Sequence, residues 1–216
     1  MQIDIITIFP KMFSNPFNES ILKRAQDKKL VKIKVHNLRD WTRDKRKTVD
    51  DRPFGGGGGM VMMIEPIHKA LDSVRKDNSF VIATTAKGET YKQSIAKELA
   101  TFEHLIIICG HYEGVDQRVL DHLVDQQISI GNYVLTGGEI PAMVIVDSVT
   151  RLLPGAVGNE DTPKDDSFYY DDKTIQYPIY TQPAEYDLDG TKLPIPDVLL
   201  SGNHAKIKKW REENKR

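Results

Sequence analysis

Short apolar runs rich in β-branched residues alternate with amphipathic segments as far as residue 153. Five of these runs predict strands, and the middle ones are apolar enough to be buried on both faces: QIDIITIF, VKIKVHNL, FVIATT, HLIIICG and QQISIG. Helical patterns lie near residues 18–29, 64–77, 89–101, 115–125 and 140–153. Because strands that alternate with helices favour crossover connections, the sequence predicts an α/β domain with a largely parallel sheet.

Composition narrows the class of protein. The 216 residues, 39% of them hydrophobic, suffice for one sizeable core with a small appendage. Cys109 is the single cysteine, which excludes internal disulfides and thiolate-rich zinc sites, and its place at the end of HLIIIC indicates a buried strand residue. We find neither a signal-peptide pattern nor an apolar run near the roughly 18 residues of a membrane helix. We therefore expect a cytoplasmic protein.

Charge is balanced overall but unevenly distributed. A net charge of −1 gives no whole-molecule attraction to nucleic acid. Basic residues gather in two segments, namely Arg39, Arg43, Lys45, Arg46, Lys47 and Arg52, and Lys206, Lys208, Lys209, Arg211, Lys215 and Arg216. Acidic residues are interleaved with both, so each segment fits either a phosphate-binding surface or an ordinary solvated face.

The texture of the chain changes after Pro154. Residues 158–175 are polar and lack periodicity, which predicts a mobile linker. Beyond it, residues 176–216 hold a proline-rich segment and a basic amphipathic helix expected over 203–216, and they are too few to fold alone. We therefore expect a main domain over 1–157 and a small, mainly helical C-terminal lobe over 176–216.

The stretch SIGNYVLTGGE, residues 129–139, predicts a binding loop. Gly131, Gly137 and Gly138 lack a Cβ, so their backbone can approach a flat ligand closely. Such a loop can bind an adenine by main-chain hydrogen bonds, donating to a ring nitrogen and accepting from the exocyclic amine. Functional groups are often carried on loops of this kind.

Two further motifs could take part in ligand binding, the glycine run and CGHYEGVD. The glycine run of residues 55–59 lacks the lysine of a phosphate-binding P-loop, so it fits a flexible flap at least as well as a phosphate site. CGHYEGVD follows a predicted strand, and ligands of open α/β sheets lie at the carboxyl ends of strands. Glu113 in this motif is either a ligand-facing carboxylate or a helix N-terminal one, and His111 either a site residue or a surface residue.

Arg151 and Asp166 are the remaining candidates. Arg151 ends an apolar helical pattern, where a cation also suits the helix dipole. Asp166 lies in the acidic linker, which would oppose RNA binding unless one of its carboxylates has a chemical task.

The motifs VDDRPFGGGGGMVMM, CGHYEGVD, SIGNYVLTGGEIPA, TRLLPG, DDSF and PDVLLSGNHAKIKKWR occur in this order along the whole chain. In sequence and spacing they resemble bacterial tRNA (guanine-N1)-methyltransferase, the TrmD family of the SPOUT class. The resemblance implies a catalytic domain with a deep C-terminal trefoil knot, and a homodimer whose active sites are shared between subunits. It also implies S-adenosylmethionine as methyl donor, Mg²⁺ dependence with ligands left unassigned, and N1 of guanine 37 beside the tRNA anticodon as acceptor.

The resemblance also implies roles for particular residues. Asp166 corresponds to the general base, Arg151 to the group that stabilises negative charge on guanine O6, and Glu113 to a carboxylate near the methionine and the guanine. The implied adenosyl site comprises Thr84, Thr85, Gly110, Ile130, Gly131, Asn132, Tyr133, Val134, Leu135, Gly137 and Gly138. The C-terminal lobe corresponds to the part that binds the anticodon arm.

The chain departs from the family pattern at a few positions. Ala86 stands where a proline is usual, Ala83 where a large residue is frequent, and Gln182 where arginine is usual. The sequence ends at Arg216, before a further basic helix that is usual in the family. We therefore expect retained cofactor binding and weaker tRNA binding than in longer relatives.

Two other functions remain as alternatives. A nucleoside triphosphate enzyme would use the glycine run but would lack the P-loop lysine. A noncatalytic RNA-binding module would use the basic segments but would leave Asp166, Arg151 and Glu113 without roles.

Overall fold

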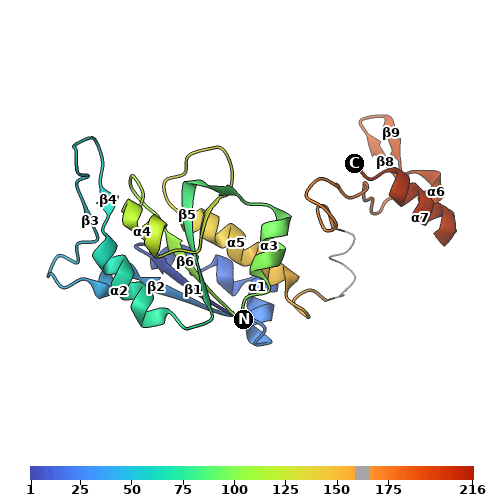
Figure 1. The fold of residues 1–216 in the computed structure, drawn as a ribbon. Helices are drawn as coiled ribbons and strands as arrows, with labels where there is room; N and C mark the ends of the chain where they lie inside the picture. Colours follow the sequence, from blue (N-terminus) through green and yellow to red (C-terminus); the bar gives the residue numbers. More distant parts are fainter. Residues whose placement is uncertain (159–165) are drawn as a thin grey trace. The chain divides into compact units, whose positions relative to one another are not determined.

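The computed structural model describes residues 1–158 and 166–216. The chain forms two compact units, Met1–Glu160 and Asp161–Arg216 (Figure 1). The predicted linker, 158–175, falls partly outside the described residues, since 159–165 are not among them.

The first unit is built on a five-stranded sheet in the order β2-β1-β6-β5-β7. Its strands are β1 (Gln2–Thr7), β2 (Lys32–Asn37), β5 (Ser79–Thr90), β6 (His104–Cys109) and β7 (Gln126–Ser129). Each neighbouring pair is parallel. All six residues of β6 are buried, as expected of a central strand covered on both faces. The prediction of an α/β domain with a parallel sheet is confirmed.

Helices cover both faces of this sheet (Figure 1). On one face pack α1 (Ser20–Asp27), α3 (Gln93–Leu99) and α5 (Glu139–Leu152). On the other pack α2 (Ile64–Val74) and α4 (Gln117–His122). Successive side chains of a strand point to opposite faces, so alternate residues of each central strand enter different cores.

The sequence LIII in β6 provides an apolar side chain for each core in turn. Leu105 and Ile107 belong to the core under α1, α3 and α5, and Ile106 and Ile108 to the core under α2 and α4. A continuous apolar run is therefore required in the middle of the sheet, because neither face of β6 meets water.

Two parts of this unit differ from the sequence prediction. The helix expected from residue 89 begins at Gln93, because Glu89 and Thr90 pair with β7 and belong to β5. The glycine run is enclosed by a short antiparallel hairpin, β3 (Asp50–Asp51) and β4 (Val61–Met62), which the sequence analysis did not predict. Strands of two residues carry too little alternation to be recognised.

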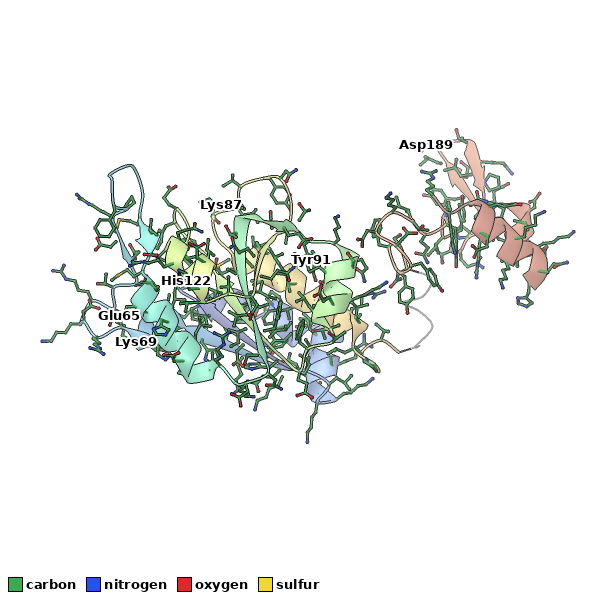
Figure 2. All side chains as sticks on the ribbon, in the orientation of Figure 1. Glu65, Lys69, Lys87, Tyr91, His122 and Asp189 are labelled. Atoms are coloured by element: carbon green, nitrogen blue, oxygen red, sulfur yellow. The ribbon has the colours of Figure 1, made fainter. Side chains whose placement is uncertain are left out.

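The second unit contains α6 (Asp197–Leu200), which was not predicted, and α7 (His204–Glu213), which agrees with the basic helix predicted over 203–216. It also contains an antiparallel hairpin of β8 (Glu185–Leu188) and β9 (Thr191–Pro194). The prediction of a mainly helical lobe did not include this hairpin. Asp189, labelled in Figure 2, and Gly190 form its two-residue turn, with φ of 52° and 86°. Asp-Gly is a strong hairpin signal, because both turn positions need positive φ.

No helix among the described residues is both long enough and apolar enough to cross a membrane.

Candidate functional site

A cavity of about 240 Å³ lies at the carboxyl ends of β5, β6 and β7. Three segments enclose it: residues 84–87 at the end of β5, residues 110–115 after β6, and the loop between β7 and α5. This is the edge of a parallel sheet where ligands bind, since loops from several strands converge there.

Most residues of the predicted adenosyl site line this cavity. They are Thr84, Thr85, Gly110, Ile130, Gly131, Tyr133, Val134, Leu135, Gly137 and Gly138. Asn132 is absent from the lining. The structure thus brings together residues that lie up to 54 positions apart, such as Thr84 and Gly138.

Gly138 closes the floor of the cavity. Its N–H donates to the carbonyl of Gly110 at 2.7 Å. A Cβ at position 138 would lie only 2.8 Å from the Gly110 nitrogen and 2.9 Å from the Cα of Cys109. Thr84 Oγ1 reaches the carbonyls of Ile108 and Gly138 at 3.2 and 3.3 Å. Only glycine therefore fits where α5 begins against the ends of β5 and β6.

The loop between β7 and α5 is organised by local hydrogen bonds. Ser129 Oγ donates to the carbonyl of Gly131 at 3.0 Å, and the Tyr133 hydroxyl donates to the carbonyl of Ile130 at 3.1 Å. Gly131 has φ of 155°, and a side chain there would overlap the Tyr133 ring. Val134 is 90% exposed, so the loop presents apolar side chains and main-chain groups at the cavity mouth.

A buried polar network lies beneath the cavity. Glu139, the first residue of α5, is 1% exposed and accepts a hydrogen bond from Thr7 Oγ1 at 2.7 Å. His111 Nδ1 lies 3.6 Å from the Glu139 carboxylate, within ion-pair range but too long for a hydrogen bond. A carboxylate at a helix N-terminus is stabilised by the helix dipole. Burial, with a contribution from Glu139, raises the pKa of the Cys109 thiol well above its usual value.

Glu113 lines the cavity beside the glycine run. A Cβ at Gly59 would lie 2.9 Å from the Glu113 carboxyl carbon. The Glu113 N–H donates to the Met60 carbonyl at 3.0 Å, and the Met62 N–H donates to the Gly114 carbonyl at 2.9 Å. The end of the glycine run is therefore attached to the cavity wall, while Phe54 at its start is fully exposed.

Arg151 and Asp166 are the two predicted catalytic residues that are not part of the cavity lining within the first unit. Arg151 is in the last turn of α5 and is partly buried. Asp166 belongs to the second unit, where its carbonyl accepts from the Tyr169 N–H at 3.3 Å. Within one unit, the structure gathers Glu113 and the residues predicted for the adenosyl site, Asn132 excepted, and it does not bring Arg151 into the same cavity.

Several further lining residues were not assigned individually to the site. Ser129 and Thr136 lie in the predicted binding loop, and His111, Tyr112, Gly114 and Val115 lie in the motif CGHYEGVD. Ala86, Lys87, Ile128 and Pro141 lie outside both. Their position directly after predicted strands, or beside the loop glycines, was the available signal. His111 was named only as an open alternative, and its side chain packs edge-on against Phe9 and Tyr112, with ring centroids 4.9 and 5.0 Å apart.

The described residues contain no group of three or more His, Cys, Asp or Glu side chains arranged to hold a metal ion. The Mg²⁺ that the family resemblance implies therefore has no ready protein ligand set in that part of the chain.

The fold and the cavity define a class: an α/β protein with a glycine-lined cavity at the carboxyl edge of a parallel sheet, the edge where open α/β sheets bind small ligands. Comparison with known proteins identifies one family within that class. The chain belongs to the family described as tRNA (Guanine-1)-methyltransferase TrmD, whose model matches residues 1–216. The resemblance seen in the sequence motifs is thereby confirmed.

Relatives named tRNA (guanine-N(1)-)-methyltransferase are similar over nearly the whole chain. A protein of Dictyoglomus turgidum is 56% identical over 213 residues, which cover 99% of this chain and 84% of the relative. One of Carboxydothermus hydrogenoformans is 51% identical over 213 residues, covering 99% and 82%. One of Staphylococcus haemolyticus is 50% identical over 216 residues, covering 100% and 86%.

Proposed function

We propose that this protein transfers a methyl group from S-adenosylmethionine to N1 of a guanine in tRNA, at position 37 next to the anticodon. The single observation that carries the proposal is the glycine-lined cavity, found in a chain that matches the TrmD family model throughout. The relatives' name, tRNA (guanine-N(1)-)-methyltransferase, supports guanine N1 of tRNA as the acceptor atom and methyltransferase as the class of enzyme. With tRNA as substrate, the reaction would take place in the cytoplasm.

The cavity fits an adenosyl ligand. Backbone groups of residues 130–135 would hold the adenine, and Gly110, Gly137 and Gly138 leave the space that side chains would otherwise fill. Thr84 and Thr85 would complete the wall at the end of β5. When bound, the donor supplies a methyl group attached to a sulfonium sulfur. A nucleophile can attack the methyl carbon, and the sulfur then leaves as a neutral thioether.

Asp166 would act as the general base. Neutral guanine carries a proton on N1, so the nitrogen becomes a good nucleophile only as that proton leaves. The Asp166 carboxylate would accept the proton, while the N1 electron pair forms the new bond to the methyl carbon and the carbon–sulfur electrons return to sulfur. Two features support this role: Asp166 has a carboxylate, and it lies in the motif DDSF at the position of the family's general base.

Arg151 and Glu113 would stabilise charge during the transfer. Negative charge grows on guanine O6 as N1 loses its proton, and a fixed guanidinium there lowers the barrier as an oxyanion hole does. Glu113 lines the cavity, so its carboxylate is suited to the cationic part of the donor.

A homodimer would complete the site. Asp166 belongs to the second unit and the cavity to the first, so the division of the chain is compatible with a base supplied by a partner subunit, as the family resemblance implies. Helix α5 carries exposed apolar residues, Ile140 at 47% and Val144 at 41%, which support a contact with another chain. We propose that each active site takes its cavity from one subunit and Asp166 from the other.

We also propose that the catalytic domain carries a deep trefoil knot. Strand β7 lies at the edge beside β5, yet the following helix α5 packs against β1, β6, α1 and α3. The segment between them therefore runs back across the ends of β5 and β6, where Gly138 contacts Gly110. Such a return path supports a threaded chain, an arrangement that ordinary α/β folds avoid.

The second unit would bind the anticodon arm. Its basic helix α7 places Lys206, Lys209 and Arg211 on exposed positions, where they can meet phosphates. The basic segment that includes Arg39 and Arg46 in the first unit would add further backbone contacts.

The test of the catalytic assignment is transfer of labelled methyl groups by Asp166→Ala. We expect transfer to fall at least ~100-fold, in the range lost with a general base, while S-adenosylmethionine affinity by calorimetry stays within about two-fold of the parent. Asp77→Ala is the matched control, because Asp77 is an exposed aspartate of the first unit outside the cavity. Transfer by Asp166→Ala within a few-fold of the control would remove Asp166 from the role.

A further inference from the structure

A four-residue bulge interrupts the end of β5. Thr84 pairs with Ile128 of β7, and the next paired residue, Glu89, faces the same Ile128. Residues 85–88 therefore leave the ladder without any matching residues on β7. Bulges re-aim side chains and are frequent beside binding sites.

Close packing fixes this bulge in place. A Cβ at Gly88 would lie 2.5 Å from both the carbonyl carbon of Gln127 and the nitrogen of Ile128. Gly88 is therefore pressed against β7, and the residues just before it extend toward the cavity. Thr85, Ala86 and Lys87 all line it. Figure 2 shows Lys87 at this end of β5, close to the loop that leads to α5.

Lys87 brings a positive charge to the cavity wall. Glu113 is the carboxylate among the lining residues, and His111 is the other lining residue that can carry positive charge. The Lys87 backbone N–H lies 3.4 Å from Thr85 Oγ1, and its ammonium makes no ion pair with any described carboxylate. The charge is thus available to an anionic group of the ligand.

We propose that Lys87 binds the α-carboxylate of the methyl donor, an inference that rests on the proposed function. S-adenosylmethionine carries two positive groups, the sulfonium and the α-ammonium, and one negative group, the α-carboxylate. Glu113 suits the positive groups, so Lys87 is the complementary partner for the negative one. Together the two side chains orient the amino-acid end of the donor while the glycine loops hold its adenosine end.

The expected effect is modest, because Lys87 is exposed and water competes for its charge. Loss of one partly solvated ion pair corresponds to roughly a three- to five-fold change in affinity. This loss should be confined to ligands that carry the carboxylate.

The experiment is a binding cycle by calorimetry with the 216-residue chain. The ligands are S-adenosylmethionine and its decarboxylated form, which differ by the carboxylate alone. The proteins are the parent, Lys87→Met and the control Lys92→Met, which removes an exposed lysine from the start of α3 outside the cavity. We expect Lys87→Met to bind S-adenosylmethionine three- to five-fold more weakly and the decarboxylated form with unchanged affinity, and Lys92→Met to bind both as the parent does.

Other outcomes decide against the inference in distinguishable ways. If Lys87→Met leaves both affinities unchanged, or weakens both equally, Lys87 does not recognise the carboxylate, although the proposed function stands. If Lys87→Met leaves both donor affinities unchanged, and a separate titration with tRNA shows weaker binding than that of Lys92→Met, the lysine contacts a phosphate of the RNA instead. If the parent binds neither ligand, the proposed function fails and the inference fails with it.

Discussion

Asp4 is a buried carboxylate whose charge stabilises the first unit. It lies in β1 with its side chain 2% exposed, and two histidines converge on it: His36 Nε2 at 2.5 Å and His104 Nε2 at 2.7 Å. Gln2 Nε2 donates a third hydrogen bond, and Ser79 Oγ lies 2.7 Å from the other ring nitrogen of His104. Burial raises the pKa of Asp4, but the hydrogen bonds outweigh burial and lower it from 3.8 to about 2.

The shift gives both a magnitude and a sign for Asp4→Asn. A fall from 3.8 to about 2 corresponds to about 2 kcal/mol of unfolding free energy, since each pKa unit is worth about 1.4 kcal/mol. Because the folded pKa is the lower one, this stability is present above pH 3.8 and is lost as the pH falls through about 2. Asp4→Asn should therefore cost about 2 kcal/mol at about pH 7 and about 1 kcal/mol at about pH 3.

Urea unfolding at both pH values measures this difference. Trp41 is a local reporter, because its ring centroid lies 5.9 Å from that of His36. The second tryptophan, Trp210, belongs to the other unit, so Trp210→Phe as a common background removes its signal from both proteins. An Asp4→Asn cost that is the same at both pH values, or below about 0.5 kcal/mol at neutral pH, would refute the reasoning.

Three further outcomes follow from the packing of the first unit. Gly138→Ala should lower the free energy of unfolding by about 1 to 3 kcal/mol and weaken S-adenosylmethionine binding, because the new Cβ would collide with the end of β6. An unchanged urea midpoint and an unchanged affinity would show that the backbone around Gly138 can shift to accept a side chain. The Cys109 thiol, fully buried with a raised pKa, should react with a thiol reagent only at the rate of unfolding, and rapid labelling of the native protein would contradict this burial. Burial raises the pKa of Tyr91 to about 12, so an ultraviolet titration should show one tyrosine ionising at higher pH than the exposed ones. Tyr91→Phe, which removes the hydroxyl 2.7 Å from Ser148 Oγ, should abolish that high-pH step. A titration curve unchanged by the substitution would contradict the raised pKa.

The sheet could be predicted from the sequence because its strands are strongly patterned. The run HLIIIC can only be satisfied between two covered faces, and the structure places it at the centre of five parallel strands. Residues 89–90 were misassigned because their pairing with β7 resumes after a bulge, a long-range contact that local periodicity does not carry.

The cavity could be predicted in part. Glycines 131, 137 and 138 identified one wall, and CGHYEGVD another, because both follow strands that end at the same edge. Lys87 gave no comparable signal, since only the bulge of β5 turns it toward the cavity. The Glu139–Thr7 hydrogen bond joins residues 132 positions apart, which no spacing rule connects.

The roles of Arg151 and Asp166 came from family motifs alone. Neither residue is part of the cavity lining, and Asp166 belongs to a different unit, so no local pattern links them to the loops around the cavity. The proposed sharing of an active site between subunits would be a property of two chains, and a single sequence could encode it only through surfaces such as the exposed residues of α5.

The most direct measurement is methyl transfer from labelled S-adenosylmethionine to two unmodified tRNAs that differ only at position 37. With guanine at this position, the account predicts stable incorporation, and digestion to nucleosides should recover the label as N1-methylguanosine. With adenine there, it predicts none. Equal incorporation into both tRNAs, or no incorporation into either by a protein that binds the donor, would contradict the proposed function.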